Sequence, residues 1–198
     1  MGSFSNIIYE ENSEGKSLRE IFLIDQPEFV FLLGESSGGI KANIEKPATL
    51  MLDNLNKIID VISLSLEFNI KKLLFLASSC VYPKHILDPM LPEMLMSGYL
   101  EPTNSAYATA KLTGLELVRS VRKEFEKDFI SCISSNCFGP HDDFISDDAH
   151  VVSALTRRMH ESKLAKSKNI SIWGSGEPVR DFLFVEDLAD GLIFLMLN

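Results

Sequence analysis

The stretch KKLLFLASSCVYPK, residues 71–84, decides the fold of this 198-residue chain. Its first half is a continuous apolar run, which is typical of a strand that is buried on both faces of a parallel sheet. The run ends abruptly in Ser78, Ser79 and Cys80, and Pro83 then interrupts regular structure. Small polar residues often end a strand without any further role, so the meaning of these side chains depends on the rest of the chain.

Composition and charge exclude several classes of protein. Hydrophobic residues make up 45% and charged residues 24% of the chain, as in ordinary globular domains. A net charge of -9 and a pI of about 4.9 argue against general binding to nucleic acid or to an acidic membrane surface. No apolar run approaches the ~20 residues that span a bilayer, and a signal-peptide pattern is missing, so we expect a cytoplasmic protein. The spacing of the three cysteines favours neither a disulfide scaffold nor a metal site.

Apolar runs alternate with amphipathic stretches, which predicts an α/β fold with a doubly wound parallel sheet. We expect strands at 28–33, 72–77, 128–134 and 169–173. The helical periodicity predicts helices at about 47–68, 104–127, 151–163 and from about 186 to the last residue. No repeat or low-complexity linker divides the chain, so residues 1–198 are expected to form a single Rossmann-like domain.

The predicted helix 104–127 carries Tyr107 and Lys111, which lie on one helical face because they are four residues apart. An ammonium group near a phenol favours the phenolate and lowers its pKa from about 10, which makes tyrosine a usable acid or base. Tyrosine and lysine at this spacing are common by chance, so their position matters. In a parallel sheet the carboxyl ends of the strands and the following helix starts share one edge, where ligands bind. We therefore expect Ser78, Tyr107 and Lys111 to lie together.

This set resembles the catalytic residues of the extended short-chain dehydrogenase/reductases, the NAD-dependent epimerase/dehydratase family. Together with the opening stretch, five further segments resemble the successive signatures of the GDP-L-fucose synthases: GGIKAN, LEPTNSAYATAKLTG, NCFGPHDDF, AHVVSALTRRMHE and WGSGEPVRDFLFVEDLAD. The resemblance runs from about residue 20 to the end. It implies NADPH-dependent conversion of GDP-4-keto-6-deoxy-D-mannose to GDP-L-fucose, by epimerisation at C3 and C5 and reduction at C4.

The resemblance also implies roles for single residues in the reduction. Tyr107 would donate the proton, Ser78 would orient the carbonyl, and Lys111 would tune Tyr107 and contact the ribose of NADPH. Asn136 would join these three residues at the cofactor.

For the epimerisations the resemblance implies that Cys80 and His150 serve as the base and the acid on opposite faces of the sugar. This is chemically reasonable because a proton next to a ketone is acidic and histidine changes charge near neutral pH. Taken alone, His150 would be read as an exposed histidine at a helix start. The GDP-sugar substrate would be bound by Arg158, Arg180 and Trp173, whereas Arg157 would face solvent.

The chain departs from the family at the cofactor. It contains no G-x-x-G-x-x-G between a first strand and helix, the loop whose N–H groups bind a dinucleotide pyrophosphate. The glycines of residues 34–39, GESSGG, have the wrong spacing, and Glu35 adds a carboxylate near the expected cofactor. We therefore expect a partial Rossmann-like fold that lacks the first strands, includes only the start of the substrate domain, and binds NADPH poorly by itself.

Three functional hypotheses stay open at this point. The chain is a reductase and epimerase, a non-catalytic remnant or fragment, or another sugar-nucleotide epimerase or dehydratase of the same branch. A homodimer is also expected, because in this branch the helices that correspond to 47–68 and 104–127 commonly pair with their copies. The apolar candidates for that interface are Leu55, Ile59, Leu115 and Val118.

Overall fold

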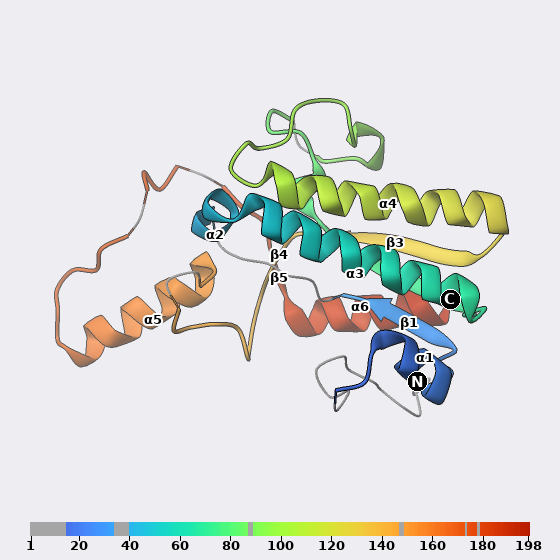
Figure 1. Ribbon diagram of the computed structural model, residues 1–198. Helices are drawn as coiled ribbons and strands as arrows, with labels where there is room; N and C mark the ends of the chain where they lie inside the picture. The colour runs from blue at the N-terminus through green and yellow to red at the C-terminus, as the bar shows by residue number, and fades with distance from the viewer. Residues whose placement is uncertain (1–14, 34–39, 87–88, 147–148, 173, 178) are drawn as a thin grey trace.

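The computed structural model describes residues 15–33, 40–86, 89–146, 149–172, 174–177 and 179–198 (Figure 1). The helices are α1 (Leu18–Asp25), α2 (Ile40–Glu45), α3 (Pro47–Glu67), α4 (Ser105–Phe125), α5 (Val151–Leu164) and α6 (Val185–Leu197), with short 3₁₀ turns η2 (Ser79–Val81) and η3 (Pro92–Met94). The strands are β1 (Phe29–Leu32), β2 (Lys72–Ser78), β3 (Asp128–Ser134), β4 (Asn136–Phe138) and β5 (Phe182–Phe184).

The main sheet has the order β1-β2-β3, and both of its strand pairs are parallel. The register pairs Ser78 with Ser134, so β2 and β3 end together in serines at the same edge of the sheet. A second, two-stranded parallel sheet joins β4 to β5 and pairs Asn136 with Phe182. The predicted α/β class with a parallel sheet is confirmed.

Side chains of β2 alternate between the two faces of the sheet, as the period of a strand requires. Phe75 lies in the core between the sheet and the layer of α3 and α4, whereas Leu74 packs on the opposite face against Leu192 and Met196 of α6. Figure 1 shows this sandwich, with α3 and α4 covering one face of the sheet and α6 the other. The continuous apolar run of β2 thus reflects burial on both of its faces.

The contact between α4 and β2 is very close at Gly114. A Cβ at this position would lie 2.5 Å from Cζ of Phe75, which is fully buried. Glycine therefore allows α4 to approach the sheet more closely than any larger residue would. This approach sets the position of Tyr107 and Lys111, which lie in the first two turns of the same helix.

Local signals account for the helix boundaries that the sequence predicts well. Pro47 occupies the first turn of α3, where the missing N–H costs nothing. The helices predicted at 47–68, 104–127 and 151–163 agree with α3, α4 and α5 to within one or two residues.

Two expectations are wrong. Residues 169–172 form no strand, and Trp173 lies outside the described residues. The strands β4 and β5 form instead. A short strand is stable only beside a partner, and an apolar run of sequence does not reveal that partner.

The expected dimer contact at Val118 is the second wrong expectation. Val118 is 3% exposed and lies in the core of its own chain, and Leu115 packs against that core.

Candidate active site

The carboxyl end of β2 opens into a cleft. Ser78 ends the strand half-buried, and the turn η2 then places Cys80, also half-buried, directly after it. The cleft has a volume of about 690 Å³. Its lining comes from the turn after β2, the loop at 89–90, the end of β3 and the segment before β5: Ser79, Tyr82, Pro89, Met90, Ile133, Ser134, Ser135 and Asp181. The pKa of Tyr82 is raised by burial and by the nearby Glu93 carboxylate, which keeps this phenol protonated at neutral pH.

Lys111 connects α4 to the end of β2. Its Nζ donates a hydrogen bond of 2.9 Å to the Leu76 carbonyl, and the residue is only 3% exposed. The same ammonium lies 5.7 Å from the centroid of the Tyr107 ring and 5.2 Å from that of Phe75, distances at which a cation attracts the face of an aromatic ring. The structure therefore brings Tyr107 and Lys111 together beside the strand that ends in Ser78.

These side chains fit the ribose and nicotinamide end of a dinucleotide cofactor. The Lys111 ammonium lies next to Tyr107, and ammonium N–H groups suit the hydroxyls of a ribose. Asn136 lies at the start of β4, where its Nδ2 donates to the Asp181 carbonyl at 3.1 Å. Since Asp181 also lines the cleft, Asn136 stabilises one of its walls. Residues 34–39, which include Glu35, lie outside the described residues.

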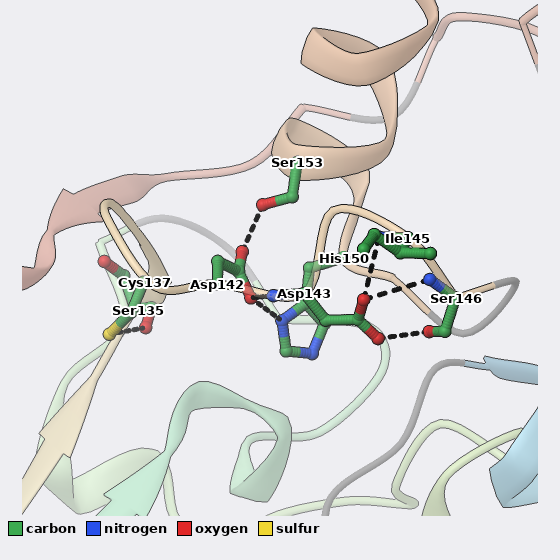
Figure 2. Close-up of polar contacts among 8 residues, drawn as sticks. All are labelled: Ser135, Cys137, Asp142, Asp143, Ile145, Ser146, His150 and Ser153. Atoms are coloured by element: carbon green, nitrogen blue, oxygen red, sulfur yellow. Dashed lines mark hydrogen bonds and ion pairs between the residues drawn. The ribbon is translucent and has the colours of Figure 1, made fainter.

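His150 occupies a different part of the molecule, at the start of α5 (Figure 2). Its Nδ1 lies 3.7 Å from Oδ1 of Asp142, and its side chain is 57% exposed against 20% for Asp142. Oδ2 of Asp142 accepts a hydrogen bond from the hydroxyl of Ser153, a residue that is almost fully buried. The histidine is exposed, as a residue at a helix start often is, but it faces a carboxylate.

The loop before His150 is stabilised by a second carboxylate. Asp143 accepts hydrogen bonds from the N–H groups of Ile145 and Ser146 at 2.8 and 3.0 Å and from the Ser146 hydroxyl, and these bonds lower its pKa from 3.8 to about 2. Arg157 of α5 donates from Nη1 to the Ile145 carbonyl. The expectation that Arg157 faces solvent is therefore wrong, because the loop carbonyl draws it inward.

The two arginines expected at a substrate diphosphate belong to separate segments. Nη1 of Arg158 donates to the Ser171 carbonyl at 3.4 Å, just before Trp173, which is outside the described residues. Arg180 is exposed, and its Nη1 donates to the neighbouring Val179 carbonyl at 2.7 Å. Both guanidinium groups bond to backbone oxygens, and both retain further donors for an anion.

Several residues of the site were not anticipated from the sequence. Ser134 and Ser135 end β3 just as Ser78 and Ser79 end β2, a repeated pattern that could have indicated them. The thiol of Cys137 donates to the Ser135 carbonyl at 3.6 Å, as Figure 2 shows. Asp142 accepts from the N–H of the next residue, Asp143, but His150 and Ser153 lie 8 and 11 residues further along the chain, so no local pattern indicates these two contacts.

The described residues include neither a metal-binding cluster nor a membrane-spanning helix. No group of three or more histidine, cysteine, aspartate or glutamate side chains there could hold a metal ion. None of the helices in that part of the chain is long and apolar enough to cross a membrane.

A parallel sheet with a serine at a strand end and a tyrosine–lysine pair beside it resembles the Rossmann-type arrangement of dehydrogenases and epimerases. Residues 6–198 match the NAD dependent epimerase/dehydratase family, and the chain belongs to that family. Within it, the chain resembles GDP-L-fucose synthases, as the sequence predicts.

Three relatives illustrate the similarity. The chain is 42% identical to the GDP-L-fucose synthase of Sinorhizobium fredii over 91% of its own length and 58% of the relative's. It is 39% identical to probable GDP-L-fucose synthase 1 of Oryza sativa, over 98% of the chain and 61% of the relative. The crystal structure of a GDP-L-fucose synthetase from Naegleria fowleri bound to NADP superposes with a TM-score of 0.79 at 30% identity, covering 90% of this chain and 58% of that one. The chain thus spans about three fifths of the length of these relatives.

Proposed function

We propose that this chain carries the reacting residues of a GDP-L-fucose synthase, which epimerises GDP-4-keto-6-deoxy-D-mannose at C3 and C5 and reduces it at C4. The observation that carries the proposal is the position of Lys111, which lies between the Leu76 carbonyl and the Tyr107 ring at the end of β2. The similarity to GDP-L-fucose synthases supports the choice of substrate.

In the reduction, Tyr107 donates a proton to the C4 oxygen of the sugar. The buried Lys111 ammonium stabilises the phenolate that remains, and this attraction is stronger in a dry site than in water. Ser78 donates a hydrogen bond to the same oxygen and orients the carbonyl. NADPH, when bound, supplies the hydride that reaches C4.

In the epimerisation, the C4 ketone acidifies the protons on C3 and C5. Cys80, in the turn η2 directly after β2, removes such a proton as a thiolate, which is the reactive form of cysteine. His150 returns a proton from the opposite face of the sugar and so inverts the carbon. Arg158 and Arg180 bind the diphosphate, because the guanidinium fork suits phosphate oxygens.

The cofactor is proposed to be NADP(H), which several structural relatives bind. Ser78, Tyr107, Lys111 and Asn136 can contact only its ribose and nicotinamide end, and the sequence contains no glycine-rich loop for the pyrophosphate. We therefore expect weak binding of NADPH by this 198-residue chain. Isothermal titration that gave a micromolar Kd would contradict this expectation.

The test of the function is solvent exchange, which needs no hydride transfer. The purified chain is incubated with GDP-4-keto-6-deoxy-D-mannose in D₂O, and deuterium at C3 and C5 is followed by NMR. Incorporation is expected for the wild-type chain and for Tyr107→Phe, whereas Cys80→Ser is expected to abolish it. Undiminished exchange in Cys80→Ser would show that Cys80 is not the base. A wild-type chain without exchange would favour the non-catalytic hypothesis.

A homodimer is also part of the proposal, through α3. Leu52 and Ile59 are 59% and 46% exposed on this helix, and a second copy could cover them. Sedimentation equilibrium at micromolar concentration is expected to give twice the chain mass. A folded monomer would exclude this assembly.

A further inference from the structure

The start of α5 and the loop before it form a polar unit around Asp142, the one part of the candidate site that no sequence pattern indicates. The two oxygens of Asp142 have different partners. Oδ2 accepts from the Ser153 hydroxyl, whereas Oδ1 accepts from the N–H of Asp143 at 2.8 Å and also faces Nδ1 of His150 at 3.7 Å (Figure 2). Ser153 is 1% exposed, so the hydroxyl that restrains the carboxylate is itself held in packed surroundings.

A second contact joins the loop to α5 and holds the two segments together. Arg157, one turn after Ser153, donates from Nη1 to the Ile145 carbonyl. Asp143 closes the intervening turn through the N–H groups of Ile145 and Ser146. The carboxylate of Asp142 therefore keeps its position relative to the helix that begins at His150.

We infer that Asp142 is a positioning residue for His150, restrained by Ser153, and that it selects which imidazole nitrogen exchanges a proton with the substrate. This inference rests on the function proposed above. A carboxylate beside Nδ1 favours a proton on that nitrogen, as in other histidines whose second nitrogen is oriented by a neighbouring acceptor. Nε2 is then the nitrogen that faces away from Asp142 and is available to the sugar.

The proton moves from Nε2 of His150 to the carbon next to the C4 ketone. The substrate reaches His150 as an enolate, after Cys80 has taken a proton from the carbon next to the C4 ketone. The Nε2–H bond breaks, and the C=C electron pair of the enolate forms the new C–H bond on the other face of that carbon. The C4 carbonyl double bond is thereby restored. His150 is left neutral with its proton on Nδ1, the form that the Asp142 carboxylate stabilises.

The test measures the tautomer of His150 in the ¹⁵N-labelled 198-residue chain by two-bond ¹H–¹⁵N correlation, with His150→Gln to assign the signals. In the wild type the Nδ1–H form is expected to be enriched. Asp142→Asn keeps an oxygen that can accept from Ser153, but it is expected to shift His150 toward Nε2–H. Ser153→Ala, which only removes the restraint on the carboxylate, is expected to give a smaller shift in the same direction.

Asp143→Asn is the matched control, since it changes the adjacent carboxylate, which faces the loop N–H groups and not His150. The Oδ1 of an asparagine can still accept from the N–H groups of Ile145 and Ser146, so the turn is expected to persist and the His150 tautomer to stay unchanged. Equal tautomer populations in the wild type and Asp142→Asn would overturn the inference, and so would an equal shift in Asp143→Asn.

Solvent exchange separates this inference from the proposed function. Asp142→Asn is expected to slow deuterium incorporation at the inverted carbon by about 10–100-fold, by analogy with the loss of a carboxylate that orients a metal-bound histidine. A tautomer shift without any exchange in the wild type would uphold the positioning of His150 and refute the epimerase function. Exchange in the wild type with an unchanged rate in Asp142→Asn would uphold the function and refute the role of Asp142.

Discussion

The two halves of the candidate site are built in opposite ways. Tyr107 and Lys111 lie on α4, against a core in which Phe75 is fully buried and Lys111 is 3% exposed. His150 lies at the start of α5, which Figure 1 shows to one side of the layered sheet, and its side chain is 57% exposed. Packing fixes the first half, whereas hydrogen bonds and charge fix the second.

The difference in burial between Lys111 and His150 affects how each side chain acts on its neighbours. A buried ammonium acts on its neighbours through a medium of low dielectric, so Lys111 can influence Tyr107 strongly without further support. An exposed imidazole is screened by water and free to rotate, so His150 depends on Asp142 for its orientation. We therefore expect the reduction half to be sensitive to volume changes and the epimerisation half to be sensitive to the loss of polar atoms.

The largest expected effect is that of Tyr107→Phe on the reduction. The ring and its packing remain, but the proton donor is lost, so the rate is expected to fall by about 10²–10⁴-fold. The rate of the reduction is measured by single-turnover oxidation of NADPH at millimolar cofactor. Tyr99→Phe is the control, because Tyr99 is 95% exposed and its hydroxyl is expected to be irrelevant. A rate within twofold of wild type would remove Tyr107 from the mechanism.

Gly114→Ala tests whether packing fixes the reduction half. The new Cβ would lie 2.5 Å from Cζ of Phe75, and α4 would have to move away from β2. We expect a loss of about 1–3 kcal/mol in the free energy of unfolding, measured in urea. Gly191→Ala in α6 has no atom within 4 Å of its Cβ and is expected to be neutral or slightly stabilising. Equal stabilities of the two variants would show that the α4–β2 contact is loose.

Arg180→Lys tests the polar side of the site. A lysine retains the charge but not the planar fork, so the Kd for GDP is expected to rise about tenfold, in line with the loss of one hydrogen bond to a charged group. Isothermal titration with GDP measures the change. Arg119→Lys is the control, because Arg119 forms an ion pair with Glu116 on α4. An unaltered Kd in Arg180→Lys would place the diphosphate elsewhere.

The smallest effect concerns the acid stability of the loop. The pKa of Asp143 is about 2 in the folded chain against an ordinary 3.8, because the Ser146 hydroxyl and then the N–H groups of Ser146 and Ile145 favour its charged form. Its stabilisation is therefore complete above about pH 4 and is lost as the pH falls through about 2. The amide shifts of Ile145 and Ser146, followed by NMR, are expected to titrate near pH 2 in the wild type and not at all in Asp143→Asn. A midpoint near pH 4 would mean that the turn is open in solution.

Local patterns were sufficient to predict the packed half. The apolar run of β2, Pro47 at the start of α3 and the four-residue spacing of Tyr107 and Lys111 depend on neighbours along the chain, and the structure agrees with all three. The role of Gly114 in the α4–β2 contact was not visible, because no pattern shows that Phe75 lies beneath it.

Other features depend on contacts between distant segments. Residues 169–172 of the predicted strand form no strand, whereas β4 and β5 pair across about 45 residues of chain. Val118 was assigned to a dimer surface because a helical pattern identifies an apolar face but not what covers it. Asp142 reaches His150 and Ser153 only because the loop folds back on α5. Periodicity and spacing are properties of the chain itself, whereas the partner of a strand, a helix face or a carboxylate exists only once the chain has folded.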